Sequence, residues 1–499
     1  MIYCNPILRG FHPDPSICRV DKDYYLVVSS FEYFPGIPVY HSRDLVNWTH
    51  IGNCIRRADE FPYENAKDSG GVWAPTIRYN DGYFYVTATF DGCGNFIIRA
   101  KDPAGEWSRP VWVREVGGID PSLYFENGHA YYCTNERLDG KDMISMQEID
   151  IESGKITGER RCVWRGIGGG YIEAPHIYRI GDWYYLLVAE GGTFYNHMAN
   201  IARSGDLWGP YESCPNNPIL TNMCDPTRQV QCSGHADLID DGEGGWWAVH
   251  LGTRLARRTM THLGRETFLT PVVWKDGWPM CGHDRKTVLL EEGPISARQE
   301  PVKGFAADME KTEWEPEWIF LRNPDMQKYR RMDGNIILSP SVDTMDGKRP
   351  TFAAVRPIDF DCVTDAVFDF SNCRPGDEAG LAVRLESSYY ITCVCGIGDS
   401  GRELRLTLRA EDIRHEVAAA TIPDGRINLR MSADKEKYTF AYSVDNNRFE
   451  VLGSVSTRFV SIDIAGRCFT GTVIGLYTSS EEQSGAEMTV YKFEILPSA

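Results

Sequence analysis

Five short segments of the sequence carry residues suited to chemistry at one shared register position. With the proline of each segment, or its equivalent Ala236, as the register mark, the preceding residues are Asp14, Ala74, Asp120, Ala174 and His235. The two copies with alanine have Trp73 and Glu173 one position earlier. Carboxylates gathered in one place raise the pKa of at least one of them, so one residue type can supply both an acid and a base. The pattern therefore predicts an acid–base site made by Asp14, Asp120 and Glu173.

The same segments also have a structural interpretation. Asp-Pro-Ser is a common turn or strand-entry sequence, in which the aspartate accepts hydrogen bonds from nearby backbone N–H groups. For a single copy we would favour that interpretation. Acids in three matching copies favour a functional one. His235 leaves several roles open, since a central histidine can fill a channel, orient a water or ligate an ion.

The elements around these positions repeat along the first three hundred residues. Each copy predicts a short strand, a tight polar turn and an aromatic strand, as in DPSI leading to DKDYYLVVSSF and APTI leading to NDGYFYVTATF. Successive register marks are 60, 46, 54 and 61 residues apart, a period typical of four-stranded propeller blades. Because the inner strand of each blade lines the channel, five blades bring the five register positions together around one axis.

A change in composition follows the fifth copy. Residues 294–305 have the character of a linker, and the remainder shows alternating strands such as LAVRLESSYYITCVCG, separated by Asp-Gly and Asn-rich turns. This is a β-sandwich pattern. We therefore expect a propeller over residues 1–295 and a sandwich over residues 306–499.

The chain resembles, in order and context, the β-xylosidase and α-L-arabinofuranosidase group of glycoside hydrolase family 43. The strings that carry the resemblance are NPILRGFHPDPSI, GGVWAPTIRY, GGIDPSLYF, GGYIEAPHIY, AEGGTFYNHMANIARS, CSGHADL and LGRETFLTPVVW. It implies an all-β enzyme with a five-bladed β-propeller, followed by a concanavalin-like β-sandwich, and hydrolysis with inversion. It also implies that Asp14 is the general base, that Glu173 is the general acid, and that Asp120 sets the pKa and orientation of that acid. The closing segment FTGTVIGLYTSS departs from the pattern expected of the group, so the leaving-group side of the pocket is not predicted.

Four further residues are candidates for binding the sugar. Phe31 and Trp73 resemble the apolar walls of the family's first subsite, with packing inside the blades as the alternative interpretation. Arg265 matches an arginine that contacts the sugar in the family; a salt bridge to Glu266 or to a blade neighbour is its alternative. His235 is the fourth candidate. No role follows from the sequence for Glu190 or Thr193, which belong to the string AEGGTFYNH.

These residues fit the requirements of inverting glycoside hydrolysis, in which one protonated carboxyl serves the leaving oxygen and one ionised carboxyl activates water. A sandwich domain covering one side of the propeller mouth would make the enzyme exo-acting. The favoured function is release of xylose from short xylo-oligosaccharides. An α-L-arabinofuranosidase acting on arabinoxylan or arabinan fragments is the alternative within the same chemistry, and a non-catalytic carbohydrate-binding propeller is the alternative from another class.

Composition narrows the other classes of function. The chain has 499 residues and a formal net charge of −18, which disfavours nucleic acid and anionic membranes as partners. With no long apolar run and no signal-like start, we expect a cytoplasmic enzyme. Its fifteen cysteines lack the regular spacing of a disulfide framework, which agrees with that expectation. No cofactor is expected to be required; a Ca²⁺ ion on the propeller axis stays open, because His235 alone cannot make a metal site. Whether the chain forms a homo-oligomer also stays open.

Overall fold

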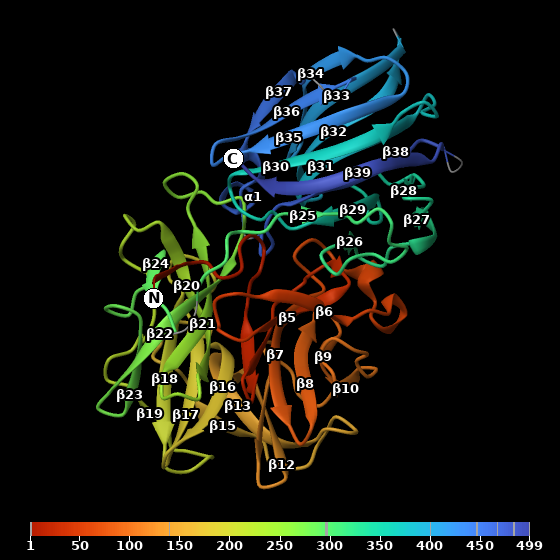
Figure 1. Cartoon of the computed structure of the whole chain (residues 1–499). Coiled ribbons are helices and arrows are strands. Elements are labelled where there is room, and N and C mark those ends of the chain that lie inside the picture. The colour runs from red at the N-terminus through yellow and green to blue at the C-terminus, as the bar shows by residue number, and fades with distance from the viewer. Residues whose placement is uncertain are drawn as a thin grey trace.

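The computed structural model describes residues 2–138, 140–294, 298–399, 401–445, 448–466, 468–482 and 485–498. Two β domains follow one another along the chain, the first coloured red to green and the second cyan to blue in Figure 1. The helical segments of the described residues are single turns: η1 (Ala58–Glu60), η2 (Tyr63–Asn65), η3 (Met326–Lys328), η4 (Thr457–Val460) and α1 (Ile462–Ala465). The prediction of an all-β chain is confirmed.

The first domain is a five-bladed propeller, as predicted. Blade 1 contains β2 (Ser16–Val20), β3 (Asp23–Val27), β5 (Gly36–Ser42) and β6 (Thr49–Ile55), and blade 2 contains β7 (Val72–Asn80), β8 (Tyr83–Phe90), β9 (Gly94–Ala100) and β10 (Val111–Val113). Blade 3 contains β11 (Ser122–Glu126), β12 (His129–Leu138), β13 (Lys141–Asp150), β14 (Lys155–Ile156) and β15 (Arg161–Trp164). Blade 4 contains β16 (Glu173–Ile180), β17 (Trp183–Glu190), β18 (Met198–Ser204) and β19 (Glu212–Ser213), and blade 5 contains β20 (Val230–Asp240), β21 (Trp246–Arg254), β22 (Glu266–Lys275) and β23 (Trp278–Cys281). The innermost strands β2, β7, β11, β16 and β20 contact one another in that order, and β20 returns to β2. This closes the ring that surrounds the channel.

The hairpins at the end of the inner strands follow from local turn chemistry. Asp81-Gly82 joins β7 to β8 with φ angles of 47° and 78°, and Asn127-Gly128 joins β11 to β12 with φ angles of 52° and 80°. Positive φ at both central residues is the type I′ geometry, which matches the twist of the paired strands and favours Asn-Gly and Asp-Gly. The polar turns that mark the repeat in the sequence are therefore the turns of these blades.

The five register positions share one unusual backbone conformation. Their φ angles are 55° at Asp14, 38° at Ala74, 52° at Asp120, 50° at Ala174 and 49° at His235. Non-glycine residues seldom adopt positive φ, and four of these residues also precede proline, which favours extended backbone. Strain of this kind persists where the surrounding structure imposes it, and it is concentrated at functional sites. The five copies thus enter the channel in the same way, as the repeat predicted.

The second domain is a sandwich of two sheets. One has the order β27-β28-β39-β30-β35-β36-β37, with β25 pairing β39: β27 (Tyr329–Met332), β28 (Asn335–Leu338), β39 (Met488–Pro497), β30 (Cys362–Asp369), β35 (Arg426–Ala433), β36 (Lys437–Ser443), β37 (Glu450–Ser456) and β25 (Phe305–Ala306). The other has the order β34-β33-β32-β31-β38-β29-β26-β4: β34 (Ile413–Thr421), β33 (Gly401–Ala410), β32 (Tyr389–Gly398), β31 (Asp377–Glu386), β38 (Val473–Ser480), β29 (Thr351–Val355), β26 (Ile319–Leu321) and β4 (Tyr33–Phe34). Buried side chains such as Trp318, Leu381, Ile474 and Phe493 fill the space between the sheets.

The two domains are joined by backbone as well as by side chains. Strand β4 comes from the propeller half of the chain, yet it pairs with β26 and completes a sheet of the sandwich. Beside it, one apolar cluster combines Phe11 and Phe31 with Phe352 and Tyr477 of the sandwich. The sandwich therefore packs directly against the propeller around residue 31. Figure 1 shows the two domains next to each other.

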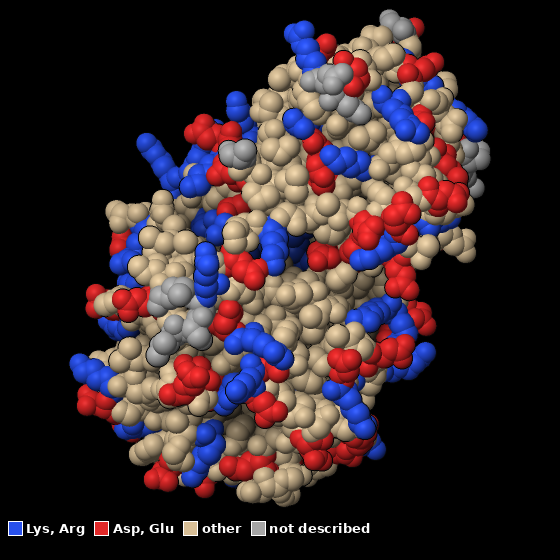
Figure 2. Space-filling model, viewed as in Figure 1, with Lys and Arg blue, Asp and Glu red and all other residues tan. Residues whose placement is uncertain are grey.

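The ends of the predicted domains lie partly outside the described residues, which include neither Ile295 nor the termini Met1 and Ala499. Strand β1 (Ile2–Cys4) pairs with β24 (Leu290–Glu292), so the start of the chain lies beside the end of the propeller half. The sandwich begins with β25 at Phe305, one residue before the expected start. None of the helices among the described residues has the length and apolar character needed to cross a membrane. Acidic and basic side chains are interspersed over the face in Figure 2.

Candidate active site

Asp14 is a buried carboxylate with two strong partners. It immediately precedes the proline before β2, accepts a hydrogen bond of 2.6 Å from Nη1 of Arg265, and accepts another of 2.6 Å from the hydroxyl of Ser29. Burial raises the pKa of Asp14, but the charge of Arg265, with His235 and Ser29, outweighs burial and holds that pKa below its ordinary value. Asp14 is therefore ionised at neutral pH, as a general base must be.

Arg265 is the hub that connects Asp14 to the second domain. Besides Asp14, its guanidinium donates to Oγ1 of Thr193 at 3.0 Å and to the backbone oxygen of Phe469 at 3.0 Å. Of the two alternative ion pairs of Arg265, the one with Glu266 is not formed, because Glu266 pairs with Arg254 at 2.7 Å, whereas the one with a blade neighbour is formed with Asp14. The arginine thus lies at the acid cluster, where it can contact a sugar that binds there.

Glu173 and Asp120 lie in a different electrostatic environment from Asp14. Burial and the charge of Asp14 raise the pKa of Glu173 to about 7, although Arg265 opposes this. Burial and the charges of Glu173 and Asp14 raise the pKa of Asp120 well above its ordinary value. Within the described residues no side chain donates a hydrogen bond to either carboxyl. The pair therefore retains a proton at neutral pH, as a general acid requires.

A glycine-rich loop before β16 leads directly to Glu173, and Glu190 holds that loop. The carboxylate of Glu190 accepts hydrogen bonds from the backbone N–H groups of Ile167 at 3.0 Å and Gly168 at 3.3 Å, and from the side chain of Asn200 at 2.5 Å. Side chains at Gly166 would collide with Glu190, since a Cβ there would lie 2.2 Å from its carboxylate. Glu190, which had no role in the sequence analysis, thus positions the segment that presents Glu173.

Phe31 and Trp73 are neighbours, because the backbones of Phe31 and Val72 pair across blades 1 and 2. Phe31 is buried and its ring lies 5.5 Å from the Arg265 guanidinium. Trp73 is half-buried and donates from its indole N–H to the backbone oxygen of Ser69 at 3.0 Å. Both predicted wall residues therefore lie beside the acid cluster, and both also pack against the interdomain apolar cluster.

Phe469, from the sandwich, is a wall residue that sequence reasoning missed. Its ring stacks on Phe31 with centroids 6.3 Å apart and lies 5.7 Å from the Arg265 guanidinium. Its loop can approach because Gly471 has no side chain: a Cβ there would lie 2.1 Å from the backbone oxygen of Leu263. The phenylalanine and glycine in FTGTVIGLYTSS were visible in the sequence, but nothing local indicated that they enter the propeller mouth.

His235 lies beside Asp14, with Nδ1 at 3.9 Å from Oδ1. Burial lowers the pKa of His235, so its imidazole is neutral at pH 7. No group of three His, Cys, Asp or Glu side chains among the described residues has the arrangement of a metal site. Whether an ion lies on the axis stays open, and contact between His235 and the sugar stays a prediction.

Below the acid cluster, the channel is blocked by a second buried network. Asp237 accepts hydrogen bonds from Arg78 at 2.8 Å, from Ser16 at 2.6 Å and from Tyr178 at 2.5 Å, and Arg78 also contacts Nδ1 of His176 at 2.9 Å. Beyond it, at the far ends of the inner strands, lies a separate cavity of about 370 Å³. The acid cluster therefore lies at one end of the channel, and the side chains of the Asp237 network fill the channel beneath it.

Comparison with known proteins places this arrangement in a family. The sequence profile of glycosyl hydrolases family 43 matches residues 3–279, and that of the β-xylosidase C-terminal concanavalin A-like domain matches residues 307–495. The chain belongs to glycosyl hydrolases family 43. It is a glycoside hydrolase, and its sandwich is the concanavalin-like domain that the resemblance implied.

Relatives of known name support the same assignment over nearly the whole chain. A non-reducing end α-L-arabinofuranosidase of Bacteroides ovatus is 39% identical, with 96% of this chain and 92% of the relative covered. A xylosidase/arabinosidase of Butyrivibrio fibrisolvens is 32% identical, with 98% of each chain covered. The solved structure described as Bacteroides ovatus xyloglucan PUL GH43B superposes with a TM-score of 0.94 at 37% identity, covering 100% of both chains. Family 43 relatives thus share both domains of this enzyme.

Proposed function

We propose that this family 43 enzyme is an exo-acting, inverting hydrolase that releases xylose from the ends of short xylo-oligosaccharides. The observation that carries the proposal is that two carboxyls at the same channel mouth have pKa values shifted in opposite directions. Arg265 holds Asp14 ionised, whereas burial and Asp14 raise the pKa of Glu173 to about 7. Environments that push two pKa values apart identify a base and an acid.

In this mechanism Asp14 accepts a proton from the attacking water, while Glu173 donates its proton to the leaving oxygen. Ser29 and Arg265 orient the carboxylate of Asp14 through their hydrogen bonds. The charge of Glu173 raises the pKa of Asp120, so the two carboxyls interact, and we assign to Asp120 the modulation of the acid's proton. Inversion follows because Asp14 activates water and forms no bond to the sugar itself.

The walls of the site support action at a chain end. Below the acids, the Arg78–Asp237 network blocks the channel, and above them the sandwich contributes Phe469 opposite Phe31. A pocket closed in this way accepts one terminal sugar and offers no path for a continuous polysaccharide. Aromatic faces suit the C–H surfaces of that sugar.

Release of L-arabinose is the second candidate, and it is favoured by the name of the Bacteroides ovatus relative, an α-L-arabinofuranosidase. The Butyrivibrio fibrisolvens relative carries both activities in its name. The third alternative, a non-catalytic binding propeller, is set aside by membership of a hydrolase family. We further propose a cytoplasmic enzyme without a required cofactor.

The test is a comparison of initial rates on 4-nitrophenyl β-D-xylopyranoside, 4-nitrophenyl α-L-arabinofuranoside and xylo-oligosaccharides. The proposal expects xylosides to be hydrolysed with the larger kcat/KM and the first product, followed by NMR, to have the inverted anomeric configuration. A larger kcat/KM on the arabinofuranoside would replace xylose by arabinose. Retained configuration would refute Asp14 as the base, and absence of turnover on every glycoside would refute the proposal.

A further inference from the structure

Ser69 connects the two halves of the sugar pocket. It lies in the loop between η2 and β7, is 9% exposed, and has a φ of 58°. Its backbone oxygen accepts the indole N–H of Trp73 at 3.0 Å, and its hydroxyl oxygen accepts the backbone N–H of Phe469 at 2.9 Å. One residue therefore bonds to a wall of the pocket in the propeller and to a wall contributed by the sandwich.

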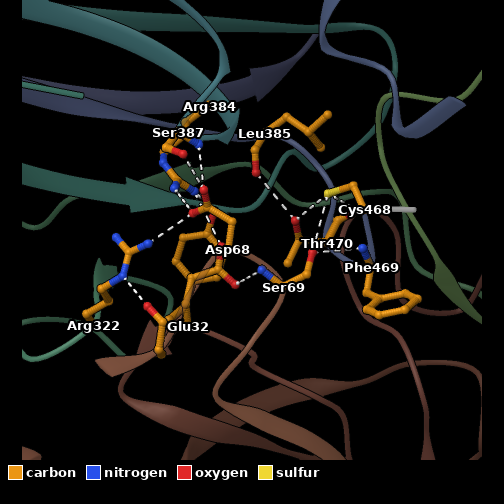
Figure 3. Close-up of polar contacts among 12 residues, drawn as sticks. Glu32, Asp68, Ser69, Arg322, Arg384, Leu385, Ser387, Cys468, Phe469 and Thr470 are labelled. Atoms are coloured by element: carbon orange, nitrogen blue, oxygen red, sulfur yellow. Dashed lines mark hydrogen bonds and ion pairs between the residues drawn. The ribbon is translucent and has the colours of Figure 1, made fainter. Parts of the chain in front are cut away.

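Glu32 holds Ser69 in this place. The backbone N–H of Ser69 donates to Oε2 of Glu32 at 3.1 Å, and Oε1 of Glu32 lies 3.5 Å from Nη1 of Arg384 (Figure 3). Glu32 and Arg384 are both fully buried, and Arg384 belongs to strand β31 of the sandwich. Because Glu32 directly follows Phe31, the same anchor also fixes the third wall of the pocket.

The neighbouring Asp68 ties the loop to the sandwich a second time. Its carboxylate accepts from Nη2 of Arg322 at 3.1 Å and from the backbone N–H of Ser387 at 3.0 Å, and it also pairs with Arg384 (Figure 3). Acids of the propeller thus meet arginines of the sandwich around the loop that carries Ser69. These buried ion pairs hold the loop against the sandwich across the domain interface. The hydroxyl of Ser69 then connects the loop to Phe469 by a hydrogen bond.

We propose that Ser69, anchored by Glu32, is a positioning residue that fixes Phe469 of the sandwich against Phe31 and Trp73 of the propeller and thereby sets the affinity for the terminal sugar. This inference rests on the proposed sugar-binding role of those walls. Ser69 itself touches none of the proposed acids or bases. Its loss therefore weakens binding of the sugar and leaves proton transfer by Asp14 and Glu173 in place.

The test uses Ser69→Gly in the full chain. Glycine tolerates the positive φ and keeps the backbone bonds to Glu32 and Trp73. It removes the hydroxyl, which accepts from the Phe469 N–H and also donates to Sγ of Cys468 at 3.6 Å. We expect KM for the preferred nitrophenyl glycoside, and Ki for the free sugar as a competitive inhibitor, to rise about fivefold, the effect of losing the hydrogen bond to Phe469. We expect kcat to change less than about twofold and the pH profile to keep its shape.

Asp359→Asn is the matched control, because the half-buried Asp359 pairs with Arg254 at 3.0 Å, and also with Arg9, in another part of the domain interface. It should lower Tm without raising KM or Ki. A second pair of variants tests the anchor: Glu32→Gln keeps an acceptor for the Ser69 N–H and should retain near-normal KM, whereas Glu32→Leu removes the acceptor and should raise KM.

Unchanged KM and Ki in folded Ser69→Gly would overturn the inference, and so would equal KM in Glu32→Gln and Glu32→Leu. A rise of KM in Asp359→Asn equal to that in Ser69→Gly would also overturn it, since any loosening of the interface would then suffice. Asp14→Asn, measured in parallel, distinguishes failure of this inference from failure of the proposed mechanism. If Asp14→Asn is inactive while Ser69→Gly is normal, only this inference fails; if Asp14→Asn is active, the proposed mechanism fails.

Discussion

The two ends of the propeller channel hold buried charge in opposite ways. At the lower end, Asp237 is satisfied by Arg78, Ser16 and Tyr178, and although burial raises its pKa, Arg78 and His176 hold that pKa well below its ordinary value. At the upper end, Asp14 is the one acid of the cluster, among the described residues, that forms an ion pair with Arg265. The pKa of Glu173 there stays above its ordinary value.

This difference separates a structural cluster from a chemical one. A buried acid with a full set of partners holds one protonation state and stabilises the fold, whereas a buried acid without partners exchanges its proton near neutral pH. Both clusters combine acids with an arginine and a serine, and both include residues in or directly beside the inner strands β2 and β16. The number of hydrogen-bond donors to each buried acid, rather than the presence of acids, distinguishes the proposed active end of the channel.

Asp14→Asn should have the largest effect on catalysis. It keeps the size of the side chain but removes the base, so kcat/KM should fall at least about 10²–10⁴-fold on activated and natural substrates alike. Because the change also leaves the buried Arg265 without its counter-charge, urea unfolding should confirm that the variant is folded under the conditions of the rate measurement. Substantial turnover of both substrate types by the purified variant would show that the upper cluster does not supply the base.

Glu173→Gln should distinguish substrates by their leaving group. A sugar leaving group needs a proton in the transition state, so hydrolysis of a xylo-oligosaccharide should slow by about 10²–10⁴-fold, and that of a nitrophenyl glycoside far less. In the unmodified enzyme, activity should fall as pH rises through about 7, because Glu173 then loses its proton. That alkaline limb should disappear in the variant; equal losses on both substrates with the limb intact would contradict its role as the acid.

Asp237→Asn makes the same chemical change at the lower end and should affect the fold instead. It leaves Arg78 without a counter-charge, so the free energy of unfolding should fall by about 3–5 kcal/mol. Since the pKa of Asp237 is depressed in the folded state, its stabilisation is present above the ordinary aspartate pKa and is lost as pH falls. The variant's deficit, followed by urea unfolding, should therefore shrink in acid. A large loss of kcat in the folded variant would remove the contrast between the two clusters.

Asp120→Asn should have the smallest effect, a shift in the pH profile. Removing a carboxyl whose charge interacts with Glu173 lets Glu173 ionise more readily, so the alkaline limb of kcat/KM should move below its position in the unmodified enzyme. The measurement is a pH profile of both enzymes on one nitrophenyl glycoside. A limb that stays in place would mean that Asp120 is neutral whenever Glu173 titrates.

Local sequence was sufficient for the repeat and for the position of the acids. The turns at Asp81-Gly82 and Asn127-Gly128 adopt the conformation that their residues favour, and the period of the aromatic strands predicted five blades. Once the blades close, residues as distant as Asp14 and His235 become neighbours, with 3.9 Å between their side chains. Family strings added the expected roles of Asp14, Asp120 and Glu173.

Only the tertiary structure decided which charges pair and what covers the site. Arg265 could pair with its neighbour Glu266 or with Asp14, 251 positions away, and the choice depends on how blade 5 meets blade 1. Phe469, 204 positions from Arg265, and strand β4 reach their partners through docking of the two domains. Turns and strand periods arise from interactions between residues close in sequence, and these are legible in the chain. Partner choice among buried charges and aromatic rings depends on packing between distant segments, which has no local signature.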